Sequence, residues 1–210
     1  MDDPILFIHG FGGFAGIWRW QKEYSSVKAP CLAIDLPGHG VRPWNGESLE
    51  AMARMAGEEC ETRGMTSVNI VASSFGGLVA IKLCEIYPDL AKRIVFAGAL
   101  PRFTASEDFP AGLDGEKIRK LAGQFQGELK TVLEMFFRSV FTPKERESEQ
   151  YARIRELRRE APLPQKEALL AVLNMLEKED LRVQLRQLNK PCLLMLGDSD
   201  PICPLPVVEA

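Results

Sequence analysis

The segment Val68-Asn69-Ile70-Val71-Ala72-Ser73-Ser74-Phe75-Gly76-Gly77 runs from an apolar, β-favouring stretch into a helical pattern. Ala72 and Gly76, two residues before and after Ser74, are small enough to allow a sharp turn from strand to helix. Such a turn holds a hydroxyl above the sheet edge, at the positive end of a helix. We therefore predict that Ser74 is a nucleophile, although an ordinary glycine-rich turn is the alternative interpretation. Ser73 lacks the spacing, because a large aromatic residue stands two positions after it.

The composition indicates one folded domain, or one domain with a sizeable insertion. The chain has 210 residues, of which 46% are apolar, enough for a substantial core. A net charge of −3 argues against a nucleic-acid-binding protein, which usually presents a basic face. The five cysteines are scattered and form no C-x-x-C pair, so neither a disulfide framework nor a zinc site is predicted. No apolar run approaches the roughly 20 residues that span a bilayer, and we expect a soluble, cytoplasmic protein.

Short apolar runs recur along the chain and predict a sheet. Continuous runs of this length suit strands that are buried on both faces, as in a parallel sheet covered by helices. Loops that follow such strands carry the functional sites. Between the second and third runs, Ser48 and the apolar spacing after it predict a helix over 48–63. The predicted strands are 5–8, 31–34, 68–71, 94–97 and 192–196.

Residues 101–189 have a different pattern, nearly free of strand signals and rich in helical spacing. We predict that this segment is a helical lid inserted into an α/β core made of residues 1–100 and 190–210. Five apolar residues in it are spaced for one buried stripe. They are Phe125, Leu129, Leu133, Phe136 and Phe137.

Acyl transfer by a serine also needs hydrogen-bond donors for the oxyanion, a base and an orienting carboxylate. The amide of Phe75 lies in the same turn as Ser74 and is one predicted donor. The glycine-rich segment 9–13 lets the backbone approach a substrate closely, and we assign the second donor to the amide of Phe11. We interpret His9 as structural; the alternative for the whole segment is a tight turn.

The acid and the base are harder to assign from the residues. Asp198 and Asp200 both follow the last predicted strand, and Asp198, nearer the strand end, suits a turn cap. The residues themselves leave both aspartates open as the acid. The chain has two histidines, His9 and His39, and both precede Ser74.

Taken together, these elements resemble the α/β-hydrolase superfamily over nearly the whole chain. The resemblance rests on the His9-Gly10-Phe11 segment, the Asp35-x-Pro37-Gly38-x-Gly40 loop, the Ser74 turn and the Gly197-x-x-Asp200-x-x-Cys203-Pro204 loop. The family's acid stands three residues after the glycine of the last motif, which implies Asp200. The fold implied is a mostly parallel sheet with flanking helices and a helical lid.

The same resemblance implies that the catalytic histidine follows the acid, after a further helix and strand. No histidine follows Asp200. We therefore expect a C-terminally shortened chain that lacks the last strand and helix of the core and is impaired as an enzyme. Alternatively, the base comes from elsewhere, such as His39 or a partner chain, or the protein is a non-catalytic relative that binds an acyl carrier or another ligand.

Within the superfamily, the predicted lid looks most like that of the biotin-synthesis esterases that cleave the methyl ester of pimeloyl-acyl carrier protein. The likeness rests on Pro101-x-Phe103-x-Ala105, Pro162-Leu163-Pro164 and Asp180-Leu181-Arg182. It implies a serine carboxylesterase that needs no metal or organic cofactor. A general short-chain carboxylesterase is the other enzymatic interpretation. The chain departs from the family at Ser73, where a bulky aromatic often precedes the nucleophile.

Basic residues gather in the predicted lid of an otherwise acidic protein. Because acyl carrier proteins are acidic, we predict that the lid docks such a carrier by charge steering. Interleaved glutamates allow another interpretation, a solvated helix face with local ion pairs. No nucleic-acid or membrane partner is expected. The predicted docking residues are Arg138, Arg153, Arg155, Arg158 and Arg159, with Lys144 and Arg146 nearby.

Overall fold

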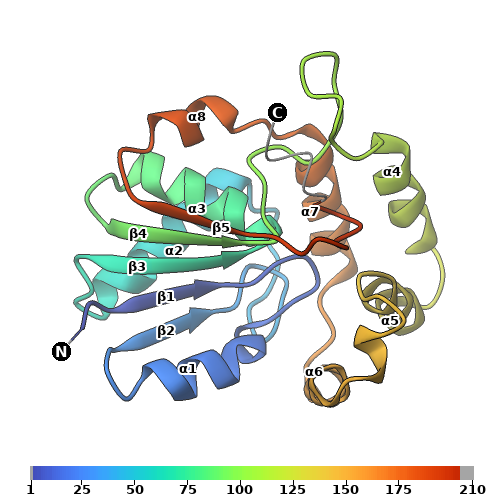
Figure 1. The fold of residues 1–210 in the computed structure, drawn as a ribbon, viewed down its shortest axis with the longest axis horizontal. Coiled ribbons are helices and arrows are strands. Elements are labelled where there is room, and N and C mark those ends of the chain that lie inside the picture. Colours follow the sequence, from blue (N-terminus) through green and yellow to red (C-terminus); the bar gives the residue numbers. More distant parts are fainter. Residues whose placement is uncertain (1, 204–210) are drawn as a thin grey trace.

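The computed structural model describes residues 2–203 and contains one sheet of five parallel strands (Figure 1). The strand order is β2-β1-β3-β4-β5, and each neighbouring pair is parallel. The α/β class with a parallel sheet is therefore confirmed. The strands are β1 (Ile5–Ile8), β2 (Cys31–Ile34), β3 (Val68–Ser73), β4 (Ala91–Ala97) and β5 (Cys192–Met195).

Helices alternate with the first four strands and then follow one another between β4 and β5. The Ser48 hydroxyl accepts a hydrogen bond from the Ala51 amide at 3.2 Å, which caps α2 where the sequence predicts a helix start. The core helices are α1 (Arg19–Ser25), α2 (Leu49–Thr62) and α3 (Phe75–Ile86), with the 3-10 helix η1 (Ala15–Trp18). The later helices are α4 (Gly115–Gln124), α5 (Leu129–Ser139), η2 (Glu145–Glu147), α6 (Glu149–Glu160), α7 (Lys166–Lys178) and α8 (Arg182–Gln187).

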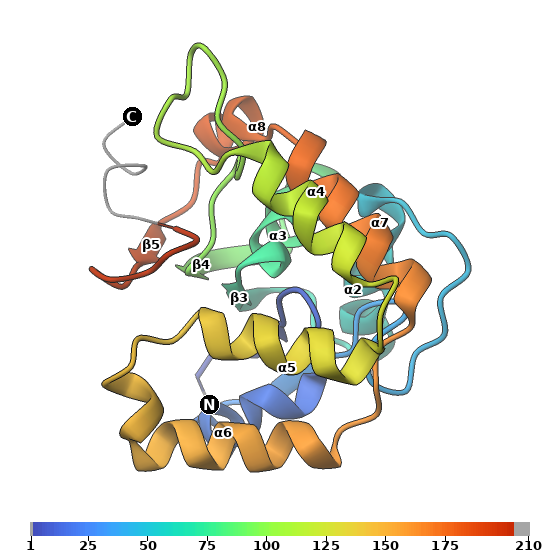
Figure 2. The same cartoon turned by 90° about the vertical axis from the view of Figure 1, so that its right-hand side faces the viewer.

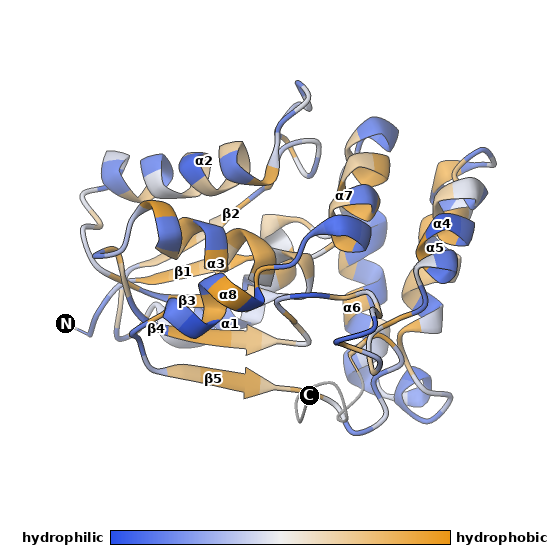
Figure 3. Ribbon diagram, turned by 90° about the horizontal axis from the view of Figure 1, so that it is seen from above, coloured by the Kyte–Doolittle hydropathy of each residue, from blue (hydrophilic) through white to orange (hydrophobic). Residues whose placement is uncertain are grey.

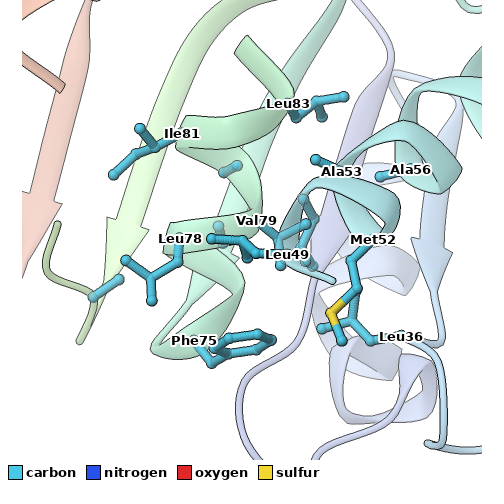
Figure 4. Close-up of a cluster of buried hydrophobic side chains, with 14 of the residues drawn as sticks. Leu36, Leu49, Met52, Ala53, Ala56, Phe75, Leu78, Val79, Ile81 and Leu83 are labelled. Atoms are coloured by element: carbon cyan, nitrogen blue, oxygen red, sulfur yellow. The ribbon is translucent and has the colours of Figure 1, made fainter. Parts of the chain in front are cut away.

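The main core lies where α2 and α3 pack together against the sheet (Figure 4). Helix α2 turns one apolar stripe inward, including Leu49, Met52 and Ala56. Helix α3 is buried on most of its surface, because it contacts α2, α8 and three strands. Each fully buried large apolar side chain stabilises the fold by about 1.5–3 kcal/mol. This packing fixes the start of α3, and with it the position of Ser74.

Helices α4 to α7 gather at the end of the sheet toward which the strands point (Figures 1 and 2). The predicted apolar stripe is divided between two helices, since α4 ends at Gln124 and α5 begins at Leu129. Phe125 and Leu133 are nevertheless both buried. The short helix α8 packs on core helix α3 instead. The domain boundaries at residues 100 and 190 remain a prediction.

An ion-pair network ties the two ends of this helical segment together. Arg102 donates from Nη1 to Asp180 Oδ2 at 2.6 Å, and Arg182 donates from Nη2 to the same oxygen at 2.7 Å. Arg182 also reaches Asp108 at 2.7 Å. Hydrogen bonds from Arg182 and Arg102 lower the pKa of Asp180. The network therefore holds the entry and exit of the segment side by side.

Strand β5 forms one edge of the sheet and is apolar along its length (Figure 3). Leu193 is 56% exposed and Met195 is 54% exposed, unlike the apolar residues of the inner strands. Within residues 2–203, none of the helices combines the length and the apolar character that crossing a membrane requires.

Candidate active site

Ser74 stands on a strained turn between β3 and α3. Its backbone has φ +50° and ψ −122°, and it is the one non-glycine residue with positive φ in the described part of the chain. Such a conformation costs about 1–3 kcal/mol and persists only where its surroundings enforce it. Here the Ser74 amide donates to Ala97 O at 3.0 Å, and the Gly77 amide donates to Ser74 O at 2.8 Å. The strand end and the first helical turn therefore hold Ser74 in place from both sides.

Two glycines let the segment 9–13 approach this turn closely. A Cβ on Gly76 would lie 2.6 Å from His9 O, and a Cβ on Gly10 would lie 2.9 Å from Ser74 Cβ. The same position on Gly10 is 3.5 Å from Ser74 Oγ. Ser74 is half-buried, so its hydroxyl is open on one side and adjoins the 9–13 loop on the other.

Two backbone amides beside Ser74 have no hydrogen-bond acceptor among the described residues. The amide of Phe75 belongs to the first turn of α3, which has no intrahelical acceptor. In the loop, the Gly12 amide donates to His39 Nε2 at 3.3 Å, and the Gly13 amide donates to Gly10 O at 3.0 Å. The Phe11 amide makes no hydrogen bond to any residue in the range 2–203. The two amides predicted to bind the oxyanion, those of Phe11 and Phe75, thus have no acceptor among the described residues.

A cavity of about 460 Å³ opens over Ser74. Its size and its mostly apolar walls suit a small-molecule site. The 3-10 helix η1 contributes Trp18, helix α1 contributes Trp20, and helix α5 contributes Phe136 and Phe137. Sequence reasoning assigned the two phenylalanines to a buried stripe and missed the two tryptophans, which lie in no recognised motif. Only the packing of α5 over the strand ends shows that these side chains form one wall.

The loop after β5 brings Asp200, and not Asp198, to this cavity. Asp200 lines it, and its Oδ1 accepts hydrogen bonds from the amides of Ile202 at 2.8 Å and Cys203 at 2.9 Å. Asp198 is exposed to solvent. The buried Cys203 thiol donates to Gly98 O at 3.1 Å, which fastens the loop to the end of β4. Geometry therefore favours the same aspartate that the family resemblance implies.

Both histidines are buried, and each of their ring nitrogens lies within hydrogen-bond distance of a backbone group. Nε2 of His9 accepts from the Leu36 amide at 3.0 Å, and its Nδ1 lies 2.8 Å from Gly10 O. Nε2 of His39 accepts from the Gly12 amide, and its Nδ1 lies 3.0 Å from Pro37 O. Neither ring is hydrogen-bonded to Ser74 in the described structure. The geometry agrees with a structural His9 and gives His39 a similar role.

Comparison with known proteins identifies the family. A family model described as the alpha/beta hydrolase fold matches residues 3–209. The chain belongs to this family. It is 28% identical over 203 residues to a pimeloyl-[acyl-carrier protein] methyl ester esterase of Nitrosomonas europaea, covering 95% of this chain and 78% of the relative. The protein of the same name in Methylococcus capsulatus is 28% identical over 215 residues, covering 98% and 80%.

Solved structures show the same fold. An esterase from Exiguobacterium antarcticum superposes with a TM-score of 0.86 at 21% identity, covering 99% of this chain and 78% of that one. The predicted resemblance to α/β hydrolases is therefore confirmed, and the similar sequences are those of esterases. Within residues 2–203, no group of three or more His, Cys, Asp or Glu residues could hold a metal ion.

The two buried histidines of this α/β hydrolase predict an acid-sensitive fold. Burial lowers the pKa of both, that of His9 from 6.5 to about 3, so the folded state holds them neutral while the unfolded chain binds protons below pH 6.5. Above pH 6.5 the histidines are neutral in both states and cost no stability. As the pH falls below 6.5, protons bind to the unfolded chain and the free energy of unfolding decreases. We expect the free energy of unfolding to fall between pH 6.5 and 5 by up to about 1.4 kcal/mol per pH unit per histidine.

Urea denaturation at several pH values measures this dependence. In His39→Gln one of the two titrating rings is gone, so the slope between pH 6.5 and 5 should be about halved. A stability that stays flat across this range in the unmodified protein would contradict the prediction.

Proposed function

We propose that this chain is a serine carboxylesterase in which Ser74 attacks the carbonyl carbon of an ester bound in the cavity above it. The observation that carries the proposal is the strained Ser74 turn, set against the 9–13 loop at the cavity wall. As Ser74 Oγ attacks, its proton passes to a base and the carbonyl oxygen becomes an oxyanion. The amides of Phe11 and Phe75 stabilise that oxyanion, each by about 3 kcal/mol.

The rest of the cycle follows from this step. The base returns its proton to the alcohol, which leaves, and an acyl group stays on Ser74. Water then attacks the acyl-enzyme and releases a carboxylate. Asp200 orients the imidazole of the base and stabilises its charged form. Because neither histidine of the chain is placed to take the Ser74 proton, full activity needs a base from outside these 210 residues.

Labelling with a fluorophosphonate tests the nucleophile. We expect a covalent adduct at Ser74 of the unmodified protein, found by mass spectrometry, with imidazole added to supply a base. Ser74→Ala should carry no adduct, whereas Ser73→Ala, the neighbouring matched control, should be labelled like the parent. Equal labelling of the parent and Ser74→Ala would remove Ser74 from the role.

We further propose that the substrate is the methyl ester of a pimeloyl-acyl carrier protein. Two similar proteins have this activity in their names. The lid also offers unpaired positive charge: the bases of residues 101–189 that form salt bridges are Arg102, Arg119, Lys120 and Arg182. Within the described residues, no carboxylate forms a salt bridge with any of the five proposed docking arginines. Four of them are exposed, namely Arg138, Arg153, Arg155 and Arg159.

Salt dependence tests carrier docking. If exposed arginines steer an acidic carrier, its binding should weaken steeply between about 50 and 500 mM salt, because the Debye length shortens well below the separation of surface charges. Binding of a small neutral ester should change little over the same range. Equal salt sensitivity for the carrier and the small ester would contradict docking through these residues.

A non-catalytic binding protein on the same scaffold is the second candidate, and the position of the two histidines favours it. The labelling experiment separates the two candidates. A binder would bind ester or carrier but would form no adduct at Ser74 even with imidazole present.

A further inference from the structure

Helix α6 carries one arginine that faces inward. Arg158 lines the cavity above Ser74, and it also lines a second cavity of about 260 Å³ between α5, α6 and residues 161–164. Phe137, Phe141 and Ile154 are shared by the two cavities in the same way. Arg158 therefore sits in the wall between the Ser74 cavity and the interior of the lid.

The guanidinium of Arg158 has few partners for its charge. Nη1 and Nη2 each donate to Gly12 O at 3.4 Å, which is long for a hydrogen bond, and the group lies over the Phe137 ring. A guanidinium has five N–H donors, so most of them are unused. No carboxylate among residues 2–203 forms a salt bridge with it. Asp200, which lines the same cavity, uses Oδ1 for amides of its own loop.

A guanidinium held in this place without a carboxylate partner destabilises the fold unless a bound anion neutralises its charge. Moving a cation into apolar surroundings without a counter-ion is unfavourable, because protein groups replace its hydration only in part. Burial lowers the pKa of Arg158 to about 9, so the group remains charged at neutral pH. A positive charge is thus held against aromatic walls next to the Ser74 cavity.

Neighbouring arginines on α6 do not share this position. Arg153 lies over the Trp20 ring, with its guanidinium 5.3 Å from the ring centre, and lines neither cavity. Arg155 and Arg159 line the second cavity alone. Among the described residues that line the Ser74 cavity, Arg158 is the single lysine or arginine. It is the one positive group that a ligand of this cavity meets.

We propose that Arg158 is the counter-ion for a carboxylate carried by the substrate, so that the Ser74 cavity takes monoesters of dicarboxylic acids. The reactive ester would lie at Ser74, the apolar chain along Trp18 and Phe136, and the free carboxylate at Arg158. A planar carboxylate matches the guanidinium fork with two parallel hydrogen bonds. A phosphate would bring a second negative charge against walls that offer no second base. Such a monoester is a ligand distinct from the carrier-linked methyl ester proposed above, whose second carboxyl group is joined to the carrier and has no negative charge. That these ligands are esters rests on the proposed function, whereas the carboxylate subsite does not.

Binding, and not turnover, is the test, because binding needs no catalytic base. The probes are monomethyl esters of straight-chain dicarboxylic acids of increasing length, each compared with its neutral dimethyl ester. Calorimetry, or the fluorescence of Trp18 and Trp20 in the cavity wall, measures the affinity. For the best chain length we expect the unmodified protein to bind the monoanion at least about tenfold more tightly, the usual size of a charge-assisted pair.

Variants of two arginines show whether the effect belongs to Arg158. Arg158→Gln should lose the preference for the monoanion while its affinity for the neutral diester changes less than about threefold. Arg186→Gln, a control at an exposed arginine of α8 that lines neither cavity, should keep the preference. Equal binding of anion and diester by the unmodified protein, or an equal loss in Arg186→Gln, would overturn the proposal.

Melting temperatures separate a binding role from a structural one. Because Arg158 has no counter-ion in the described structure, Arg158→Gln and Arg158→Met should melt at or above the temperature of the parent. A clear fall in both variants would mean that the guanidinium is a structural clamp on Gly12, and it would overturn the proposal. A positive binding result with no Ser74 labelling would leave the carboxylate subsite standing and reject the esterase.

Discussion

Ester hydrolysis by residues 1–210 is expected to be about 10⁴–10⁶-fold slower than that of a serine esterase with a complete triad, and Ser74→Ala is expected to slow it little further. The members of a catalytic triad act as a unit, so removing one of them costs nearly as much as removing all. The residual rate comes from binding and from the oxyanion donors. Initial rates on a small activated ester, for the parent and Ser74→Ala, measure both parts of this prediction.

Added imidazole should reveal the role of Ser74. A small base that enters the cavity can accept the serine proton, so the parent should accelerate well beyond the solution reaction while Ser74→Ala follows the solution reaction alone. Ser73→Ala is the matched control and should behave like the parent. Rapid hydrolysis by the parent without added base would contradict the prediction and would mean that a base is present within the chain.

Gly76→Ala is expected to lower the free energy of unfolding by about 1–3 kcal/mol, the usual cost of overpacking, and to abolish labelling of Ser74. The added methyl group would lie 2.6 Å from His9 O and 2.7 Å from Ile8 O. These are backbone oxygens of β1 and its loop, which cannot turn away as a side chain can. The start of α3 must therefore move away from the 9–13 loop, and the oxyanion donors separate from Ser74.

Gly123→Ala is the matched control, since this glycine also lies in a helix but has no atom within 4 Å of the added Cβ. It should stabilise the protein by about 0.5–1 kcal/mol, the helix preference of alanine over glycine. Chemical denaturation of both variants measures the difference. Similar stabilities for the two alanine variants would show that the close approach at Gly76 is not a constraint.

Much of the core could be predicted from local pattern. The five apolar runs correspond to β1 to β5. Burial on both faces explains an apolar inner strand such as β1, whereas β5 has the same pattern although its residues are exposed. The turn at Ser74 was predictable because small residues flank one serine at a spacing that a strained turn requires. Local pattern left the choice between Asp198 and Asp200 open, since both follow β5. The family resemblance implied Asp200, and the folded loop shows that Asp200 lines the cavity.

The helical segment shows the limit of this reasoning. Phe136 and Phe137 have the spacing of a core stripe, but the stripe crosses a helix break and the two rings line a cavity. Interleaved charges on α6 predicted local ion pairs as readily as a docking face. Which arginine faces inward depends on how α6 packs over the strand ends, and no local pattern encodes that orientation.

By itself the sequence determined the fold class, the strained serine turn and the family, because each depends on residues close together along the chain. The tertiary structure alone decided that both histidines are bound to the backbone, that Asp200 lines the Ser74 cavity and that Arg158 faces into it. These facts depend on contacts between residues distant in sequence, where packing and burial, rather than local preference, set each side chain's position and charge.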